Sequence, residues 1–124
     1  MICLDTNLVR GLVKGAKESA ELIEWYQSGE VLLSAVPAWY EFLCGPITGQ
    51  QIGAIRAFLS GGISAFEEVQ ATEAARLFNA TGRIRRLRVD AMIAATAIAA
   101  SARLATSNTE DFKTFVPRGL KLVL

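Results

Sequence analysis

The chain has 124 residues, which is enough for one hydrophobic core and too few for two. It contains no histidine, so imidazole is excluded as a general base, a zinc ligand or a phosphate-transfer nucleophile, and hydrolysis would have to depend on carboxylates, metal-activated water or both. A net charge of +1 neither indicates nor excludes a nucleic-acid partner, which leaves that question to local clusters of charge.

Short apolar runs bounded by polar or turn residues alternate along the chain with helical patterns. The runs predict strands over residues 1–4, 31–34, 63–66, 104–106 and 120–124. Helical spacing of apolar residues, or a proline suited to a first turn, predicts helices over 18–27, 37–44, 50–59, 73–86 and 90–102. This alternation is typical of a single α/β domain with a mainly parallel sheet.

The hydrophobic content is high, at 52%, but it does not indicate a membrane protein. The longest apolar run, 91–102, is too short to cross a bilayer, and no charged-then-apolar leader opens the chain. We therefore expect a cytoplasmic protein with no membrane partner, in which Cys3 and Cys44 are two buried thiols in a reducing compartment. The apolar surplus indicates that a partner chain covers part of the surface.

Four acidic residues fall where strands are expected to give way to helices: Asp5, Glu41, Asp90 and Asp111. The carboxyl ends of parallel strands share one edge, and crossover helices begin at that edge, so the four side chains are expected to converge. Two like charges about 4 Å apart near a protein surface cost about 4 kcal/mol, so such a cluster would recruit a cation. Its all-oxygen ligands indicate Mg²⁺ or Mn²⁺.

Each acid also has a simpler explanation. Asp5 and Asp90 could be helix N-caps, and Asp111 could be a first-turn residue favoured by the helix dipole. Glu41 is less easily explained in this way, because its neighbours Trp39, Tyr40, Phe42 and Leu43 are apolar and a carboxylate among them needs a compensating group.

Four motifs in this order resemble the PIN-domain family, and in particular the VapC-type toxin endoribonucleases of toxin–antitoxin pairs. They are Leu4-Asp5-Thr6-Asn7, residues 34–45 with Glu41, residues 90–97, and residues 104–112 before a last predicted strand. The resemblance implies a three-layer α/β/α fold with about five strands and one nuclease domain over 1–124. The chain differs at Thr96, where the family often has a histidine.

The resemblance also implies residue roles. Asp5, Glu41, Asp90 and Asp111 would be the catalytic, metal-binding acids, and Thr6, Thr106 and Asn108 would support them or orient the substrate. The implied reaction is Mg²⁺- or Mn²⁺-dependent hydrolysis of RNA. The implied partners are a VapB-like antitoxin and a second copy of the chain.

Carboxylates repel RNA, so phosphate contacts would have to come from nearby cations. Arg83, Arg85, Arg86 and Arg88 lead into Asp90, and Arg10 follows Asp5, which makes these arginines candidates for RNA binding. The arginine run could equally be a solvated helix end whose charges favour the helix dipole.

Two other classes of function stay open at this point. One is a phosphotransfer or signalling domain on a flavodoxin-like sheet. The pattern disfavours this class, because the residue two positions after Asp5 is Asn7 rather than a second aspartate, and no aspartate ends the strand at 63–66. The other is an inactive PIN-like module that binds RNA or protein. The helix at 37–44 is apolar around most of its circumference, which predicts a homodimer or a partner helix packed against it.

Overall fold

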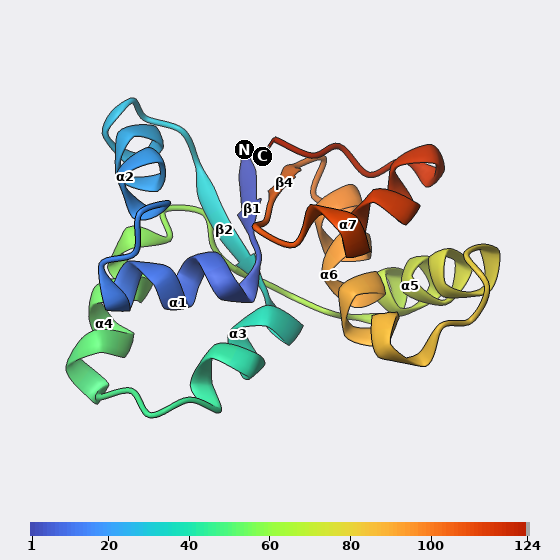
Figure 1. Ribbon diagram of the computed structural model, residues 1–124, viewed down its shortest axis with the longest axis horizontal. Coiled ribbons are helices and arrows are strands. Elements are labelled where there is room, and N and C mark those ends of the chain that lie inside the picture. Colours follow the sequence, from blue (N-terminus) through green and yellow to red (C-terminus); the bar gives the residue numbers. More distant parts are fainter. Residues whose placement is uncertain (124) are drawn as a thin grey trace.

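A four-stranded parallel sheet forms the centre of the molecule in the computed structural model, which describes residues 1–123 (Figure 1). Its strands lie in the order β3-β2-β1-β4. Their bounds are β1 Ile2–Leu4, β2 Leu32–Ala35, β3 Gly62–Ser64 and β4 Arg103–Ala105. The α/β class and the parallel sheet predicted from the sequence are therefore confirmed.

Helices connect and cover these strands. They are α1 Thr6–Lys14, α2 Ser19–Gln27, α3 Val36–Leu43, α4 Gly49–Phe58, α5 Glu68–Ala80, α6 Arg88–Ala99 and α7 Thr109–Phe112. Two 3₁₀ segments complete the described chain, η1 Arg85–Leu87 and η2 Lys113–Arg118. No helix within residues 1–123 is long and apolar enough to span a membrane.

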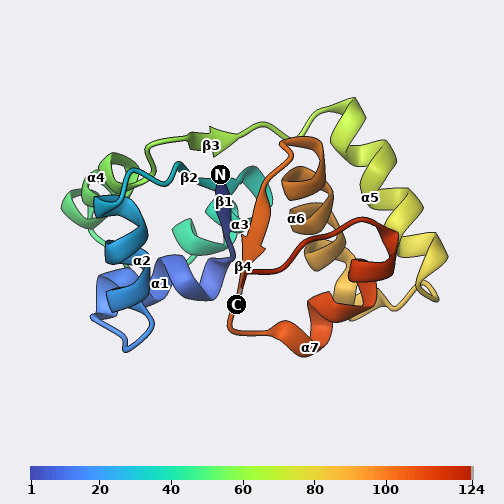
Figure 2. The same cartoon turned by 90° about the horizontal axis from the view of Figure 1, so that it is seen from above.

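Two apolar clusters lie on opposite faces of the sheet. One joins alternate strand residues such as Ile2 and Leu4 to α1, α2, α3 and α4, and the other joins Cys3 and Leu104 to α5, α6 and α7. Both views show these two groups of helices on either side of the strands (Figures 1 and 2). Successive residues of a strand point to opposite faces, so a strand as short as Ile2–Leu4 contributes to both cores. The result is a three-layer arrangement.

The order of the strands creates a switch in winding between β1 and β4. The chain proceeds outward from β1 to β2 and β3, and then crosses through α5 and α6 to place β4 on the other side of β1. In open parallel sheets, ligands bind at the carboxyl edge beside such a switch. Leu4 is paired with Ala105 at the end of the two strands, so Asp5 and Thr106 are the first residues beyond that edge.

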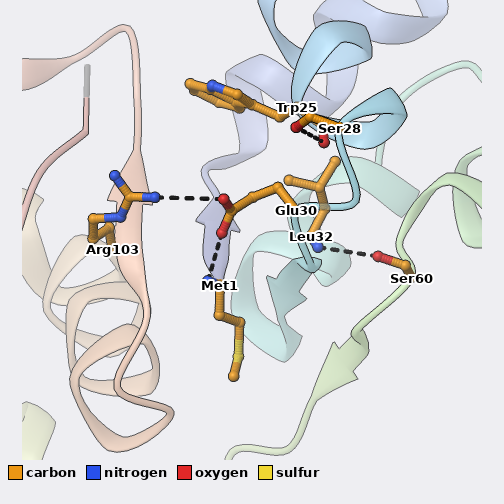
Figure 3. Close-up of polar contacts among 7 residues, drawn as sticks. All are labelled: Met1, Trp25, Ser28, Glu30, Leu32, Ser60 and Arg103. Carbon is orange, nitrogen blue, oxygen red and sulfur yellow. Dashed lines mark hydrogen bonds and ion pairs between the residues drawn. The ribbon is translucent and has the colours of Figure 1, made fainter.

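The opposite, amino edge of the sheet carries a conventional ion-pair cluster. One carboxylate oxygen of Glu30 accepts a hydrogen bond from the Met1 ammonium at 2.6 Å, and the other lies 3.7 Å from the Arg103 guanidinium (Figure 3). The pKa of Glu30 is lowered, chiefly by its hydrogen bond from the Met1 ammonium. At this edge the acid is matched by cations.

Several predicted elements need correction. The region 120–124 forms only an isolated bridge between Leu122 and Leu104, and Leu124 lies outside the described residues, so the described sheet has four strands rather than about five. The helix predicted over 73–86 is α5, which begins five residues earlier and ends at Ala80 because Gly82 and Arg83 both adopt positive φ. The sequence analysis predicts no helix over Thr6–Lys14, where the structure forms α1.

Two predictions about burial also change. Cys3 is buried, but Cys44 at the end of α3 is exposed, so only one of the two thiols lies in the core. The apolar circumference of α3 divides into two faces. Trp39 and Phe42 are buried in the core, whereas Tyr40 and Leu43 are exposed.

Gly61 leads into β3 where the backbone approaches β2 closely. A Cβ at this position would lie 2.8 Å from a methyl of Val31 and 3.1 Å from the carbonyl oxygen of Leu32. Gly61→Ala is therefore expected to destabilise the fold by about 1–3 kcal/mol, because backbone or β2 must shift. Gly53→Ala, in α4 with open space around it, should instead stabilise by about 0.5–1 kcal/mol. Urea unfolding of both variants checks this, and equal stabilities would contradict it.

Candidate active site

Asp5 extends the central strand and is almost fully buried, with 5% of its surface exposed. One carboxylate oxygen accepts the Thr6 backbone N–H at 2.8 Å, which confirms the N-cap alternative for Asp5. The other accepts the Thr106 hydroxyl at 2.8 Å, across the switch in winding. Burial raises the pKa of Asp5, while these two hydrogen bonds act in the opposite direction. The most buried acid of the site is thus held by both strands that flank the switch.

Glu41 reaches the same edge from α3. Its carboxylate accepts the Thr6 hydroxyl at 2.8 Å, so a single residue, Thr6, bonds to two of the acids. Arg10 donates to the backbone carbonyl of Glu41 at 2.7 Å, and its charge opposes part of the rise that burial causes in the pKa of Asp5. The compensating group expected for Glu41 is therefore a hydroxyl from α1, and Arg10 is engaged in holding α1 against α3.

Asp111 lies in the first turn of α7 and both of its carboxylate oxygens are occupied. Arg86 donates to one at 2.6 Å and the Asn108 side-chain amide donates to the other at 2.9 Å. These contacts lower the pKa of Asp111, the Arg86 hydrogen bond most of all. The Asn108 backbone N–H also donates to the Thr106 hydroxyl at 2.9 Å, which connects α7 to Asp5.

Asp90 is the least compensated of the four acids. It is the third residue of α6, which begins at Arg88, so the N-cap alternative for Asp90 is wrong. Within residues 1–123 its half-buried carboxylate makes no hydrogen bond or ion pair, in contrast to the other three acids. Burial, followed by the charges of the neighbouring acids, raises the pKa of Asp90 to about 6, although Arg86 acts in the opposite direction. The three acids that act on it are Asp5, Asp111 and Glu41.

The donor set suits a hard divalent cation, although the side chains do not enclose one. Among residues 1–123, no three Asp, Glu, Cys or His side chains are close enough together to form a closed metal site. Mg²⁺ commonly uses only one or two protein carboxylates and keeps several waters, so it does not require a closed cluster. The carboxylate of Asp90, which has a raised pKa and no hydrogen-bond or ion-pair partner among residues 1–123, fits such a cation.

The arginines predicted to bind RNA are distributed differently from a helix end. Arg83 donates to Asn79, and Arg88 donates to the backbone carbonyl of Arg85. Arg86 contacts Asp111 directly. Arg83 lies in the turn after α5, Arg85 and Arg86 lie in η1, and Arg88 begins α6. The arginines are exposed, as the alternative expects, but none lies in the last turn of an α-helix, where its charge would favour the helix dipole.

The structure also contains a hollow that the sequence analysis does not predict. It has a volume of about 480 Å³ and lies among α1, α3 and the start of α4, with Arg10, Lys14, Phe42, Ile47 and Gln51 among its lining residues. Its walls come from three separate segments, so no local motif predicts it. Thr96, at the position where the resemblance expects a histidine, is buried and donates to the Met92 carbonyl of its own helix.

Comparison with known proteins agrees with this architecture. The PIN-domain profile matches residues 2–115, and the chain therefore belongs to the PIN-domain family. No curated protein sequence matches the chain significantly.

Solved structures with the same fold include a toxin–antitoxin complex from Klebsiella pneumoniae, with 26% identity, a TM-score of 0.72 and coverage of 90% of each chain. VapBC2 from Rickettsia felis bound to a promoter DNA fragment has 23% identity and a TM-score of 0.73, with coverage of 99% of this chain and 98% of that one. FitAcB from Neisseria gonorrhoeae has 22% identity and a TM-score of 0.73, with coverage of 100% and 97% respectively.

The raised pKa of Asp90 predicts an unusual pH dependence of stability. The folded protein retains a proton on Asp90 up to about pH 6, whereas the unfolded chain releases it near the ordinary aspartate pKa of 3.8. The folded state therefore binds more protons in this window, and its stability falls as pH rises from about 4 towards 7. The lowered pKa of Asp111 has the opposite effect on stability. It stabilises the folded state, and this contribution is lost only as the pH falls below the ordinary pKa of an aspartate.

We expect Asp90→Asn to raise the stability of the metal-free protein at pH 7.5 by on the order of 1–2 kcal/mol, because solvent screens part of the repulsion at this half-buried site. At pH 4 the variant and the parent should be nearly equal. Thermal melts in a chelating buffer at both pH values measure the effect. A variant less stable than the parent at pH 7.5 would contradict this account of the site.

Proposed function

We propose that the domain, residues 1–124, is a metal-dependent endoribonuclease and the toxin of a VapBC-type toxin–antitoxin pair in the cytoplasm. The proposal rests on one observation: a PIN-family chain brings carboxylates from four separate elements to the carboxyl edge of its sheet, beside the switch in winding. The repulsion felt by Asp90 supports a cation as the missing partner. The similarity to a toxin–antitoxin complex supports the biological setting.

Asp90 and Asp5 are the proposed principal ligands of Mg²⁺ or Mn²⁺, with Glu41 and Asp111 completing the acidic, catalytic set. A bound divalent ion would supply an activated water and stabilise the charge that develops on the leaving oxygen. Thr106 and Asn108 would fix the carboxylates of Asp5 and Asp111, since each already donates to its acid. Thr6 would do the same for Glu41.

The proposed substrate is RNA, held by cations around an otherwise negative site. Arg85 is exposed on η1, and Arg88 begins α6 two residues before Asp90. Arg83 precedes η1 on the same segment, and Arg10 lies on α1, where its charge acts on Asp5. Phosphates on either side of the scissile bond would thus meet positive charge from two separate segments.

The proposed protein partners are a second copy of the chain and a VapB-like antitoxin. Val36, Tyr40 and Leu43 recur at i, i+4 and i+7 on the outer side of α3, with exposed fractions of 40%, 67% and 43%. Such an apolar stripe suits a two-fold contact between copies. The hollow beside Arg10 is lined both by the cations Arg10 and Lys14 and by apolar residues such as Phe42, so it suits a partner segment that carries apolar and acidic residues.

RNA hydrolysis should require both the metal and the carboxylates. Thr106→Val is expected to reduce cleavage by about 10- to 100-fold, because support of a metal ligand is lost, and Asp5→Asn should reduce it further. Cleavage of a labelled RNA is measured with Mg²⁺, with Mn²⁺ and with EDTA. Thr72→Val, on the exposed face of α5, provides a matched control and should retain full activity. Thermal melting establishes that each variant is folded.

Metal alone should also raise the melting temperature of the parent protein, since it binds only the folded chain. Undiminished cleavage in EDTA, or full activity of Asp5→Asn, would contradict the nuclease mechanism. A folded parent that binds RNA, is unaffected by metal and cleaves nothing would identify the alternative, an inactive PIN module.

Self-association should depend on the outer side of α3. The double substitution Tyr40→Lys and Leu43→Lys is expected to halve the mass observed by sedimentation at tens of micromolar, because two charges replace apolar contacts at the centre of the interface. Val69→Lys alters an equally exposed apolar residue on α5 and should leave the mass unchanged. A parent protein that sediments as a monomer would contradict the homodimer.

A further inference from the structure

Arg86 and Asp111 form an ion pair at the edge of the acidic site, at 2.6 Å. The two residues are 25 positions apart in sequence, and the pair joins η1, which precedes α6, to α7, which follows β4. The charge of Asp90 also acts on Arg86, after that of Asp111. The guanidinium therefore lies in the electrostatic field of the same carboxylates that are proposed to hold the metal.

Neither carboxylate oxygen of Asp111 is without a protein donor in this arrangement. One oxygen accepts Arg86 and the other accepts Asn108. Each oxygen keeps a second lone pair, so a metal that binds Asp111 would lie beside one of these two donors. Arg86 is the one that a cation would displace, because both carry positive charge, whereas the neutral Asn108 amide can remain beside a metal-bound carboxylate.

The cost of displacing Arg86 is small. Its side chain is 66% exposed and packs into no core, so it can rotate away without disturbing η1. A solvent-exposed ion pair is worth about 0–1 kcal/mol, far less than a buried one. The released guanidinium would still lie next to the site, with a planar pair of donors suited to a phosphate.

We propose that Arg86 is an intramolecular counterion that competes with the divalent metal for Asp111, so that metal loading frees its guanidinium to bind the RNA phosphate. This inference rests on the proposed function and assigns to one residue of the arginine run a role that its neighbours do not share. Arg86 opposes metal binding and promotes RNA binding. The two effects of its removal therefore have opposite signs.

The first test measures metal binding without RNA. Calorimetric titration of Mn²⁺ compares the parent protein with Arg86→Gln and Arg85→Gln. The two variants lose the same charge from the same 3₁₀ turn, but only Arg86 contacts Asp111. Arg86→Gln is expected to bind Mn²⁺ about two- to fivefold more tightly than Arg85→Gln, as the loss of a weak competing pair requires.

A double-mutant cycle separates direct competition from long-range charge. In an Asp111→Asn background, Arg86→Gln should bind Mn²⁺ no more tightly than Arg85→Gln, because the contested carboxylate is absent. Equal affinities of the two variants in the Asp111 protein would overturn the proposal. So would a gain that persists in the Asp111→Asn background.

The second test measures the Michaelis constant for RNA. Arg86→Gln should raise it by several-fold despite the tighter metal binding, and Arg86→Lys should recover part of the loss because it keeps the charge but not the planar donors. A Michaelis constant that falls in Arg86→Gln would overturn the release of Arg86 to phosphate. Failure of the proposed function has a different signature, since the parent protein itself would then bind no Mn²⁺ and cleave no RNA.

Discussion

Mutual repulsion of carboxylates at one edge of the sheet is the constraint on which the site depends. Asp5 cannot move, because it continues the central strand and caps α1, and its burial makes its charge costly. Hydrogen-bond donors from several segments offset the negative charge of these acids. Thr6 and Thr106 bond to Asp5, the Thr6 hydroxyl bonds to Glu41, and the Arg86 guanidinium pairs with Asp111. This shell compensates three of the acids and leaves Asp90 with no protein partner among the described residues.

The two edges of the sheet illustrate how selective this arrangement is. At the amino edge, Glu30 lies between the Met1 ammonium and Arg103, so its charge is matched and its pKa is lowered. At the carboxyl edge, burial and then the like charges of the neighbouring acids raise the pKa of Asp90, and Arg86 offsets only part of this effect. The same fold therefore neutralises an acid where only packing is required and leaves one unbalanced at the position where parallel sheets bind ligands. The contrast supports the carboxyl edge as the position of the proposed metal site.

Much of this site could be predicted from the sequence because it depends on local position. An acid directly after a strand, or at the start of a crossover helix, must lie at the carboxyl edge of a parallel sheet whatever the details of packing. Asp5 and Asp90 are such residues. The helix Thr6–Lys14 was missed although its sequence carries the signal, since Leu8, Val9, Leu12 and Val13 recur at helical spacing and pack in or against the core.

Contacts between distant segments could not be predicted in the same way. The pairing of Arg86 with Asp111 depends on where α5 ends, and the sequence pattern extended that helix through the arginines. Positive φ at Gly82 and Arg83 turns the chain instead and places η1 against α7. The hollow beside Arg10 has the same origin, since three segments must pack before it exists.

The lack of compensation at Asp90 also bears on the choice between an enzyme and an inactive binding module. An asparagine of nearly the same shape at this position would relieve the repulsion from Asp5, Asp111 and Glu41 and would leave α6 intact. A module that only binds RNA gains nothing from an additional negative charge, which weakens its attraction for phosphate. A nuclease needs that charge to hold a divalent ion. The repulsion at Asp90 lowers the stability of the fold, and only the enzyme gains from it, because the charge would hold the metal. For this reason we favour the nuclease over the binding module.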